Sequence, residues 1–180
     1  MRALGPGSVS SFLKIILDVV YYALFIGLGG VGVAMLVGLL LSFNPEEIHK
    51  IAGEMKINGA TSDAASVIPM IASALIYAAL YLGALLAIVS RLRKVFATLT
   101  SGDPFHPENI RRLRLIGFVL AGMEIARYGL RAALSMFAPG VAGDVDGFNI
   151  TTWFAVLVVF VLAEVFREGA RLRREAELTI

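Results

Sequence analysis

The residues best suited to chemistry lie within an apolar stretch of the chain. Glu124 falls near the middle of this stretch, about 16 Å along a helix from Leu113. Arg127 and Arg131 follow at i+3 and i+7, so a helix places all three on one face with Tyr128 beside them. A lone charge at the centre of a bilayer costs at least ~2.5–3.5 kcal/mol. This cost favours turning the charged face inward and pairing Glu124 with Arg127.

Two tyrosines in another apolar stretch extend this intramembrane polar cluster. Tyr77 and Tyr81 lie one helical turn apart and could supply hydroxyl partners to the charges. One interpretation is functional: an ion path, a substrate path or a sensing site. The other is structural, a buried ion pair that sets helix register while Arg131 reaches outward to the membrane surface. The sequence leaves both open.

Residues for catalysis or cofactor binding are scarce. The chain has no cysteine, and its two histidines, His49 and His106, are far apart. It also lacks a phosphate-cradling glycine loop, a metal-binding histidine pair and a nucleophile elbow. We therefore predict no catalytic residue, no metal, no cofactor and no enzymatic activity.

Two polar segments carry a second set of candidate residues. Residues 102–117 read GDPFHPENIRRLRLIG, and residues 166–180 read FREGARLRREAELTI. In these residues the chain resembles the bacterial membrane family called domain of unknown function 2975, and four apolar stretches extend the resemblance over nearly the whole chain. The candidates for binding a cytoplasmic partner are Gly102, Pro104, Phe105, Asn109, Arg112, Leu178 and Thr179.

The resemblance implies little about activity, because this family has no established biochemistry. Its members are often encoded beside a small helix-turn-helix regulator, which implies a cytoplasmic protein partner. The first hypothesis is therefore a non-enzymatic sensor or docking protein in the membrane. The alternative is a small transporter or channel, acting as a homo-oligomer and using the charged face at Glu124.

Composition indicates that these residues are carried by membrane helices. Of the 180 residues, 58% are hydrophobic and only 17% are charged, where a soluble domain has about 25%. A span needs about 20 mostly apolar residues. We predict an all-α fold, an antiparallel four-helix transmembrane bundle forming one domain over residues 1–180, with spans at about 14–43, 65–90, 112–137 and 149–166.

The distribution of Lys and Arg predicts the orientation. Basic residues gather in the segment 91–111, in the first turn of the third span and in the tail 167–180, whereas the segment between the third and fourth spans has Asp144 and Asp146 and no base. Because cytoplasmic loops are enriched in Lys and Arg, both termini and the segment 91–111 are predicted to lie inside, at the bacterial inner membrane. Positive-inside anchoring accounts for these charges, so no direct nucleic-acid binding is predicted.

Local patterns predict further detail. Asn44, Pro45 and Glu47 resemble a helix start, and they predict a short amphipathic helix over about 45–57 in the first extracytoplasmic loop. The second span is expected to continue as a helix past the membrane until residues 101–104, with Pro107 opening the next helix.

Small and charged residues predict how the helices contact one another. Small residues at Gly30, Ala34 and Gly38, at Ala79, Gly83 and Ala87, and at Gly117 and Ala121 predict close seams between helices. Lys14 and Asp18 are spaced for an interfacial ion pair within one helix.

Overall fold

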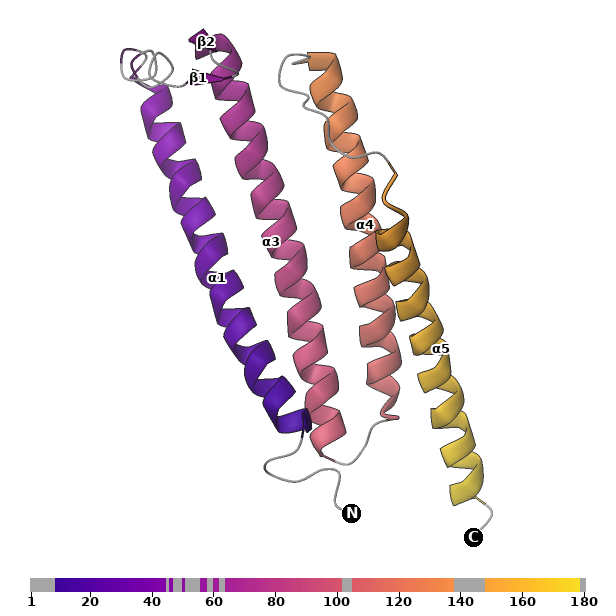
Figure 1. Ribbon diagram of the computed structural model, residues 1–180. Coiled ribbons are helices and arrows are strands. Elements are labelled where there is room, and N and C mark those ends of the chain that lie inside the picture. The colour runs from indigo at the N-terminus through magenta and orange to yellow at the C-terminus, as the bar shows by residue number, and fades with distance from the viewer. Residues whose placement is uncertain are drawn as a thin grey trace. The chain divides into compact units, whose positions relative to one another are not determined.

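In the computed structural model, the described part of the chain forms four long α-helices (Figure 1): α1 (Val9–Ser42), α3 (Ala64–Thr100), α4 (Pro107–Phe137) and α5 (Ile150–Glu177). The structure describes residues 9–44, 46, 50, 56–57, 60–61, 64–101, 105–137 and 148–178. The predicted all-helical class is confirmed for these residues, apart from two strands of two residues each.

Three of the helices are long and apolar enough to cross a membrane: Phe12–Ser42 in α1, Met70–Thr100 in α3 and Ile150–Glu177 in α5. Large apolar side chains on α1 and α5, among them Phe25, Ile26, Phe154 and Leu157, are exposed on the protein surface. Exposed apolar surface of this extent indicates a lipid environment. The described helix α4 does not meet the same criterion, because charged residues interrupt it.

The two short strands correct one prediction. Lys56–Ile57 (β1) pairs antiparallel with Ala60–Thr61 (β2), with Lys56 opposite Thr61 and Ile57 opposite Ala60. The amphipathic helix predicted over 45–57 therefore cannot extend to Ile57. Most of its remaining residues, 45, 47–49 and 51–55, lie outside the described residues.

The helices extend past the apolar stretches as expected. The second apolar helix continues to Thr100, and the next begins at Pro107. The last helix runs on to Glu177 with Arg174 in its final turn, where a cation interacts favourably with the helix dipole. At its other end Asn149 is the N-cap, and its side chain accepts hydrogen bonds from the amides of Thr151 (3.1 Å) and Thr152 (3.3 Å).

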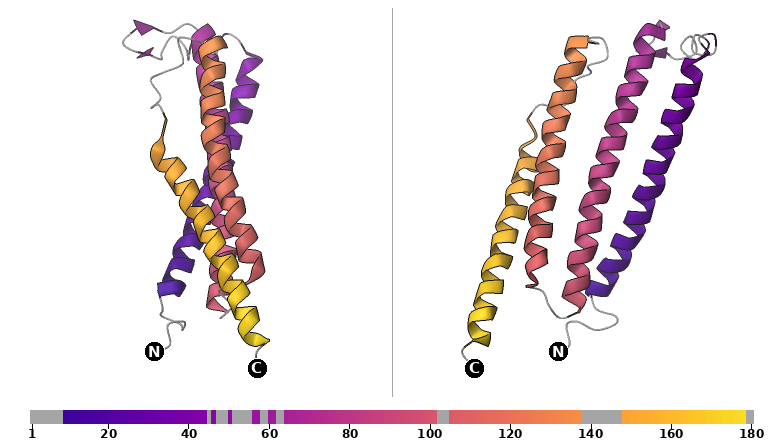
Figure 2. Two further views of the ribbon diagram at one scale, coloured as in Figure 1. Left: turned by 90° about the vertical axis from the view of Figure 1, so that its right-hand side faces the viewer. Right: turned by 180° about the vertical axis from the view of Figure 1, so that it is seen from behind.

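The chain divides into two compact units, and each is described by itself. Unit 1 comprises residues 1–25, 84–124 and 148–180, and unit 2 comprises residues 26–83 and 125–147. Within unit 1, the first turns of α1 and α4 and the last turns of α3 and α5 lie at the same end (Figures 1 and 2). We call this the basic end, because most of the chain's arginines lie within about three turns of these helix ends: Arg91, Arg93, Arg111, Arg112, Arg114, Arg167, Arg171, Arg173 and Arg174.

The core of unit 1 joins α3, α4 and α5. Its buried residues are Ile88, Leu113, Ile116 and Ala163, and partly buried side chains such as Val119 and Phe166 pack around them. Both views of Figure 2 show α5 beside the N-terminal half of α4. This core holds the three helices whose polar residues form the candidate site.

Glycines mark where helices approach closely, and they correct the predicted seams. A Cβ built on Gly30, Gly38 or Gly83 would meet no atom within 4 Å in the described part of the chain, so the tight packing predicted at these three residues is not seen there. The expectation holds for Gly117, where a Cβ would lie 3.0 Å from the ring of Phe160. In unit 2, Gly27 faces Leu82 at 3.7 Å.

Candidate functional site

A buried asparagine connects α3 to α4 at the basic end. Asn109 is 0% exposed, and its Nδ2 donates to the Thr98 hydroxyl at 2.6 Å. Its Oδ1 accepts from Nη1 of Arg112 at 3.0 Å, and the same Nη1 lies 3.1 Å from the carbonyl oxygen of Lys94. Leaving a buried polar group without its partner costs about 1–3 kcal/mol. Asn109 and Arg112 therefore hold the α3–α4 corner, and Asn109 offers no surface to a partner.

The first turn of α4 explains why Asn109 points inward. Pro107 occupies the first helical position, where its missing N–H costs nothing. The His106 side chain accepts from the Glu108 amide at 3.2 Å, and the Asn109 amide donates to the His106 carbonyl oxygen at 2.9 Å. Glu108 contacts Arg112 one turn later at 3.4 Å. The sequence HPEN thus starts the helix and sets the direction of Asn109.

Phe105 connects the same corner to α5. Its ring centroid lies 5.8 Å from that of Phe166, and a Cβ built on Gly169 would overlap the Phe105 ring. Only a residue without a side chain permits this approach. The structure therefore brings together the two segments that carry the family resemblance, the one around Phe105 and the one around Gly169.

Exposed apolar residues lie in both of these segments. Phe105 remains 37% exposed, and Leu172, on the Gly169 face of α5 at i+3, is also exposed. Leu178, at the end of α5, is 87% exposed. These leucines stand out on a helical segment that otherwise carries charge pairs such as Arg173–Glu177 at 3.0 Å. The other predicted partner-binding residues, Gly102, Pro104 and Thr179, lie outside the described residues.

An arginine that the sequence analysis did not select holds α1 in place. Arg93 of α3 forms an ion pair with Asp18 of α1 at 2.5 Å (Nε to Oδ1). Its guanidinium carbon lies 4.4 Å from the ring centroid of Tyr21 and 5.9 Å from that of Tyr22. The predicted partner of Asp18 was Lys14, and the structure shows Arg93 instead. A guanidinium both pairs and stacks, which an ammonium does less well, but only the fold brings residues 18 and 93 together.

A second arginine cluster spans α4 and α5. Arg114 of α4 lies 3.8 Å from Glu164 of α5, and Arg167, one turn further along α5, contacts the other oxygen of the same carboxylate. Two cations therefore share one anion, and positive charge is left in excess.

The predicted intramembrane cluster is divided between the two units. Glu124, in unit 1, is only 5% exposed. In unit 2, the guanidinium of Arg127 lies 5.1 Å from the ring centroid of Tyr128, Arg131 follows one turn later on α4, and Tyr77 and Tyr81 stack on each other with centroids 6.0 Å apart. Among the described residues, no group of three or more His, Cys, Asp or Glu side chains is placed to hold a metal ion. Whether the tyrosines serve the charges stays a prediction.

The fold and this site define a helical protein with the features of a membrane protein and a polar, arginine-rich end. The chain belongs to the family described as protein of unknown function (DUF2975), whose model matches residues 56–180. The match includes both segments that Phe105 and Gly169 bring into contact. No curated protein and no solved structure matches the chain.

Proposed function

We propose that this chain is a four-span protein of the bacterial cytoplasmic membrane, with both termini and residues 91–111 on the cytoplasmic side. Support comes from the three apolar helices and from the arginines at the basic end of unit 1. In this topology α4 is the third span. The burial of Glu124 favours it, because an inward-facing carboxylate avoids the cost of contact with lipid.

Its role in this proposal is to dock a cytoplasmic protein. The observation that carries the proposal is the packing of Phe105 against Gly169, which joins the two family segments into one surface at the basic end. Buried members of these segments, such as Asn109, hold the surface together. Exposed apolar members, namely Phe105, Leu172 and Leu178, remain for a partner. Exposed apolar side chains grouped on a charged surface are a feature of protein-interaction sites.

The proposed partner is a small helix-turn-helix regulator, the class that the family resemblance implies. Beyond the apolar stretch, α5 is stabilised by ion pairs between Arg171 and both Glu168 and Glu175. A helix stabilised by such pairs can present Leu172 to a groove on the partner, with Leu178 exposed at the end of the helix. Binding would retain the regulator at the membrane, away from DNA.

The test is co-purification of the detergent-solubilised chain with a co-expressed regulator. The variant L172A/L178A removes two exposed side chains and is expected to lower capture at least about tenfold, because interface anchors contribute roughly 2 kcal/mol or more. The matched control L157A/I150A truncates two exposed apolar residues elsewhere on α5. Capture unchanged by L172A/L178A and by F105A, with the variants still folded, would refute docking at this surface.

A small oligomeric transporter or channel is the second candidate. The observation that favours it is Glu124, a buried carboxylate that follows the apolar run 115–123 of α4 and precedes Arg127 and Arg131 on the same helix. Ionisable residues inside membrane segments commonly mark ion or proton paths. Four spans form a pore by assembling copies, so this function requires a homo-oligomer.

A further inference from the structure

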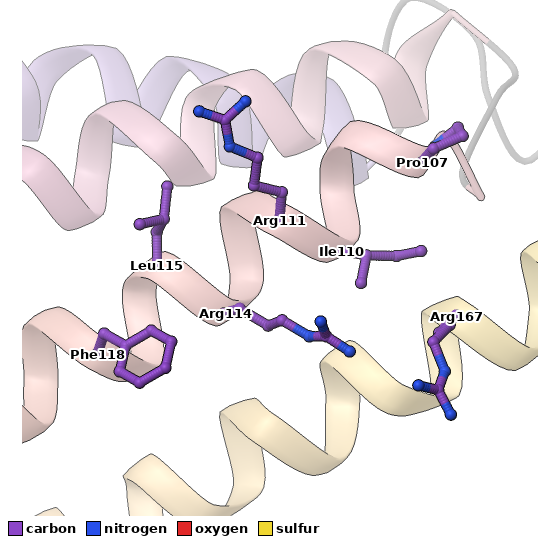
Figure 3. A pocket seen from close by; sticks show the side chains of 7 residues that line it. All are labelled: Pro107, Ile110, Arg111, Arg114, Leu115, Phe118 and Arg167. Carbon is purple, nitrogen blue, oxygen red and sulfur yellow. The ribbon is translucent and has the colours of Figure 1, made fainter.

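A groove between α4 and α5 combines cationic and apolar walls. It has a volume of about 370 Å³ and opens at the surface of unit 1. Arg114 extends from α4 toward α5, and Arg167 lies on the neighbouring turn of α5 (Figure 3). The lining residues used below are Arg111, Arg114 and Arg167, with Ile110, Leu115 and Phe118. We call it the arginine groove.

We propose that the arginine groove binds one anionic phospholipid, with the phosphate between Arg114 and Arg167 and an acyl chain against Leu115 and Phe118. This site is independent of the docking surface proposed above. It requires only that α4 enters the membrane beyond residue 114.

Charge supports an anionic occupant. Glu164 is shared by Arg114 and Arg167, and Glu108 is shared by Arg111 at 4.0 Å and Arg112 at 3.4 Å. Three of these arginines, Arg111, Arg114 and Arg167, line the groove against the two carboxylates, which leaves an excess of one positive charge. Guanidinium groups are well suited to phosphate oxygens, which they can hold through two parallel hydrogen bonds. Basic pockets between membrane helices on the cytoplasmic side bind lipid headgroups in this way.

The order of residues along α4 supports a lipid rather than a free anion. Arg111 and Arg114 come first, and Leu115 and Phe118 follow toward the apolar stretch, Phe118 about 6 Å beyond Arg114 at the helical rise. A phospholipid presents phosphate and then hydrocarbon in the same order from the membrane surface inward. The Phe118 ring is braced edge-to-face on Phe160 with centroids 5.2 Å apart, so the apolar wall is preformed. A free phosphate has no apolar part that could contact this wall.

The test measures lipid binding to the full chain in detergent by native mass spectrometry. Short-chain phosphatidylglycerol is compared with phosphatidylcholine of the same chain length and with glycerol 3-phosphate. We expect at least about tenfold tighter binding of phosphatidylglycerol than of either, since each arginine near a lipid phosphate contributes roughly fivefold. R114Q/R167Q should abolish this preference. The matched control R171Q/R173Q removes two ion-paired arginines of the same helix end and should retain it.

Three outcomes would overturn the proposal. Equal binding of the two lipids would refute recognition of the anionic headgroup. Equal loss in both double variants would show attraction by overall charge. Binding of glycerol 3-phosphate as tight as that of the lipid would show a free-anion site. Should R114Q/R167Q fail to fold, R167Q alone decides: this side chain is 60% exposed, and about fivefold weaker binding is expected, whereas unchanged binding refutes the site.

Discussion

The ring of Phe105 lies where the side chain of any other residue at Gly169 would have to lie. This contact joins the loop after α3 to the polar part of α5. It also gives a reason for a glycine within a helix, where glycine is otherwise unfavourable by about 1 kcal/mol. Because the Phe105 ring lies so close to the Gly169 backbone, a substitution of Gly169 tests this part of the structure directly.

Replacing Gly169 by alanine should therefore destabilise the protein. The added methyl must displace the Phe105 ring, and overpacking of this kind costs about 1–3 kcal/mol, more than the gain in helix propensity. Thermal unfolding in detergent measures the effect. The control is Gly122→Ala in α4, where a Cβ meets no atom within 4 Å in the described part of the chain and stability should stay equal or rise. Equal stability of both variants would contradict the Phe105 contact.

The hydrogen bond between Asn109 and Thr98 should appear as coupling in a double-mutant cycle. N109A removes the bonds of the buried Asn109 side chain to the part-buried Thr98 hydroxyl and to the Arg112 guanidinium, and a loss of about 1–3 kcal/mol is expected. In the T98V background the loss should be smaller by about 1 kcal/mol or more. Thr100, whose hydroxyl contacts only its own helix in the described structure, is the control. Strict additivity of N109A and T98V would exclude the bond.

Arg93 should resist conservative replacement. R93K keeps the charge opposite Asp18 but loses the contact of the guanidinium with the Tyr21 ring, which costs about 0.5–1 kcal/mol. R93A also leaves the Asp18 carboxylate unpaired and should cost more. Lys94→Ala is the control, because the side chain of Lys94 is exposed and only its carbonyl oxygen serves the corner. If R93K matches the wild type in thermal stability, the ring contact contributes nothing.

Substitution of Glu124 distinguishes the structural interpretation of this residue from the transport interpretation. E124Q keeps the size and the hydrogen-bonding oxygen of the buried side chain but removes its charge. If the protein is a proton-coupled transporter or channel, flux in liposomes should fall at least about tenfold while the protein still folds. The reason is that the amide of E124Q cannot bind and release a proton as the carboxylate does. E124Q that transports as well as the wild type would remove the main support for that candidate. The exposed Glu177→Gln serves as the control.

Reporter fusions test the proposed topology. Alkaline phosphatase, which is active only outside the cytoplasm, should be inactive when fused after Leu178 and active when fused after Asn44. This follows because the arginines of α4 and α5 gather at the basic end and such charges stay inside. Phosphatase activity after Leu178 but not after Asn44 would indicate the opposite orientation. Phosphatase activity at both positions would exclude an even number of spans.

The sequence by itself determined the long helices, because they follow from local features: runs of apolar residues with few charges, which end at Gly, Pro and Asn. It also placed the helix break after Thr100 and the restart at Pro107, since both depend on short-range backbone preferences. The family followed from residues 102–117 and 166–180. The third span differs, because the charges of α4 make composition alone inconclusive.

Only the tertiary structure decided which polar residues meet. Asn109 looked like a surface residue for a partner, yet it is fully buried against Thr98, and Asp18 pairs with Arg93 rather than with its helical neighbour Lys14. Likewise, among the residues that the structure describes, the close approaches occur at Gly117 and Gly169, not along the regular stripe of Gly30 and Gly38. The physical reason is that such contacts depend on the rotation and register of helices distant in sequence, which spacing along one helix does not encode.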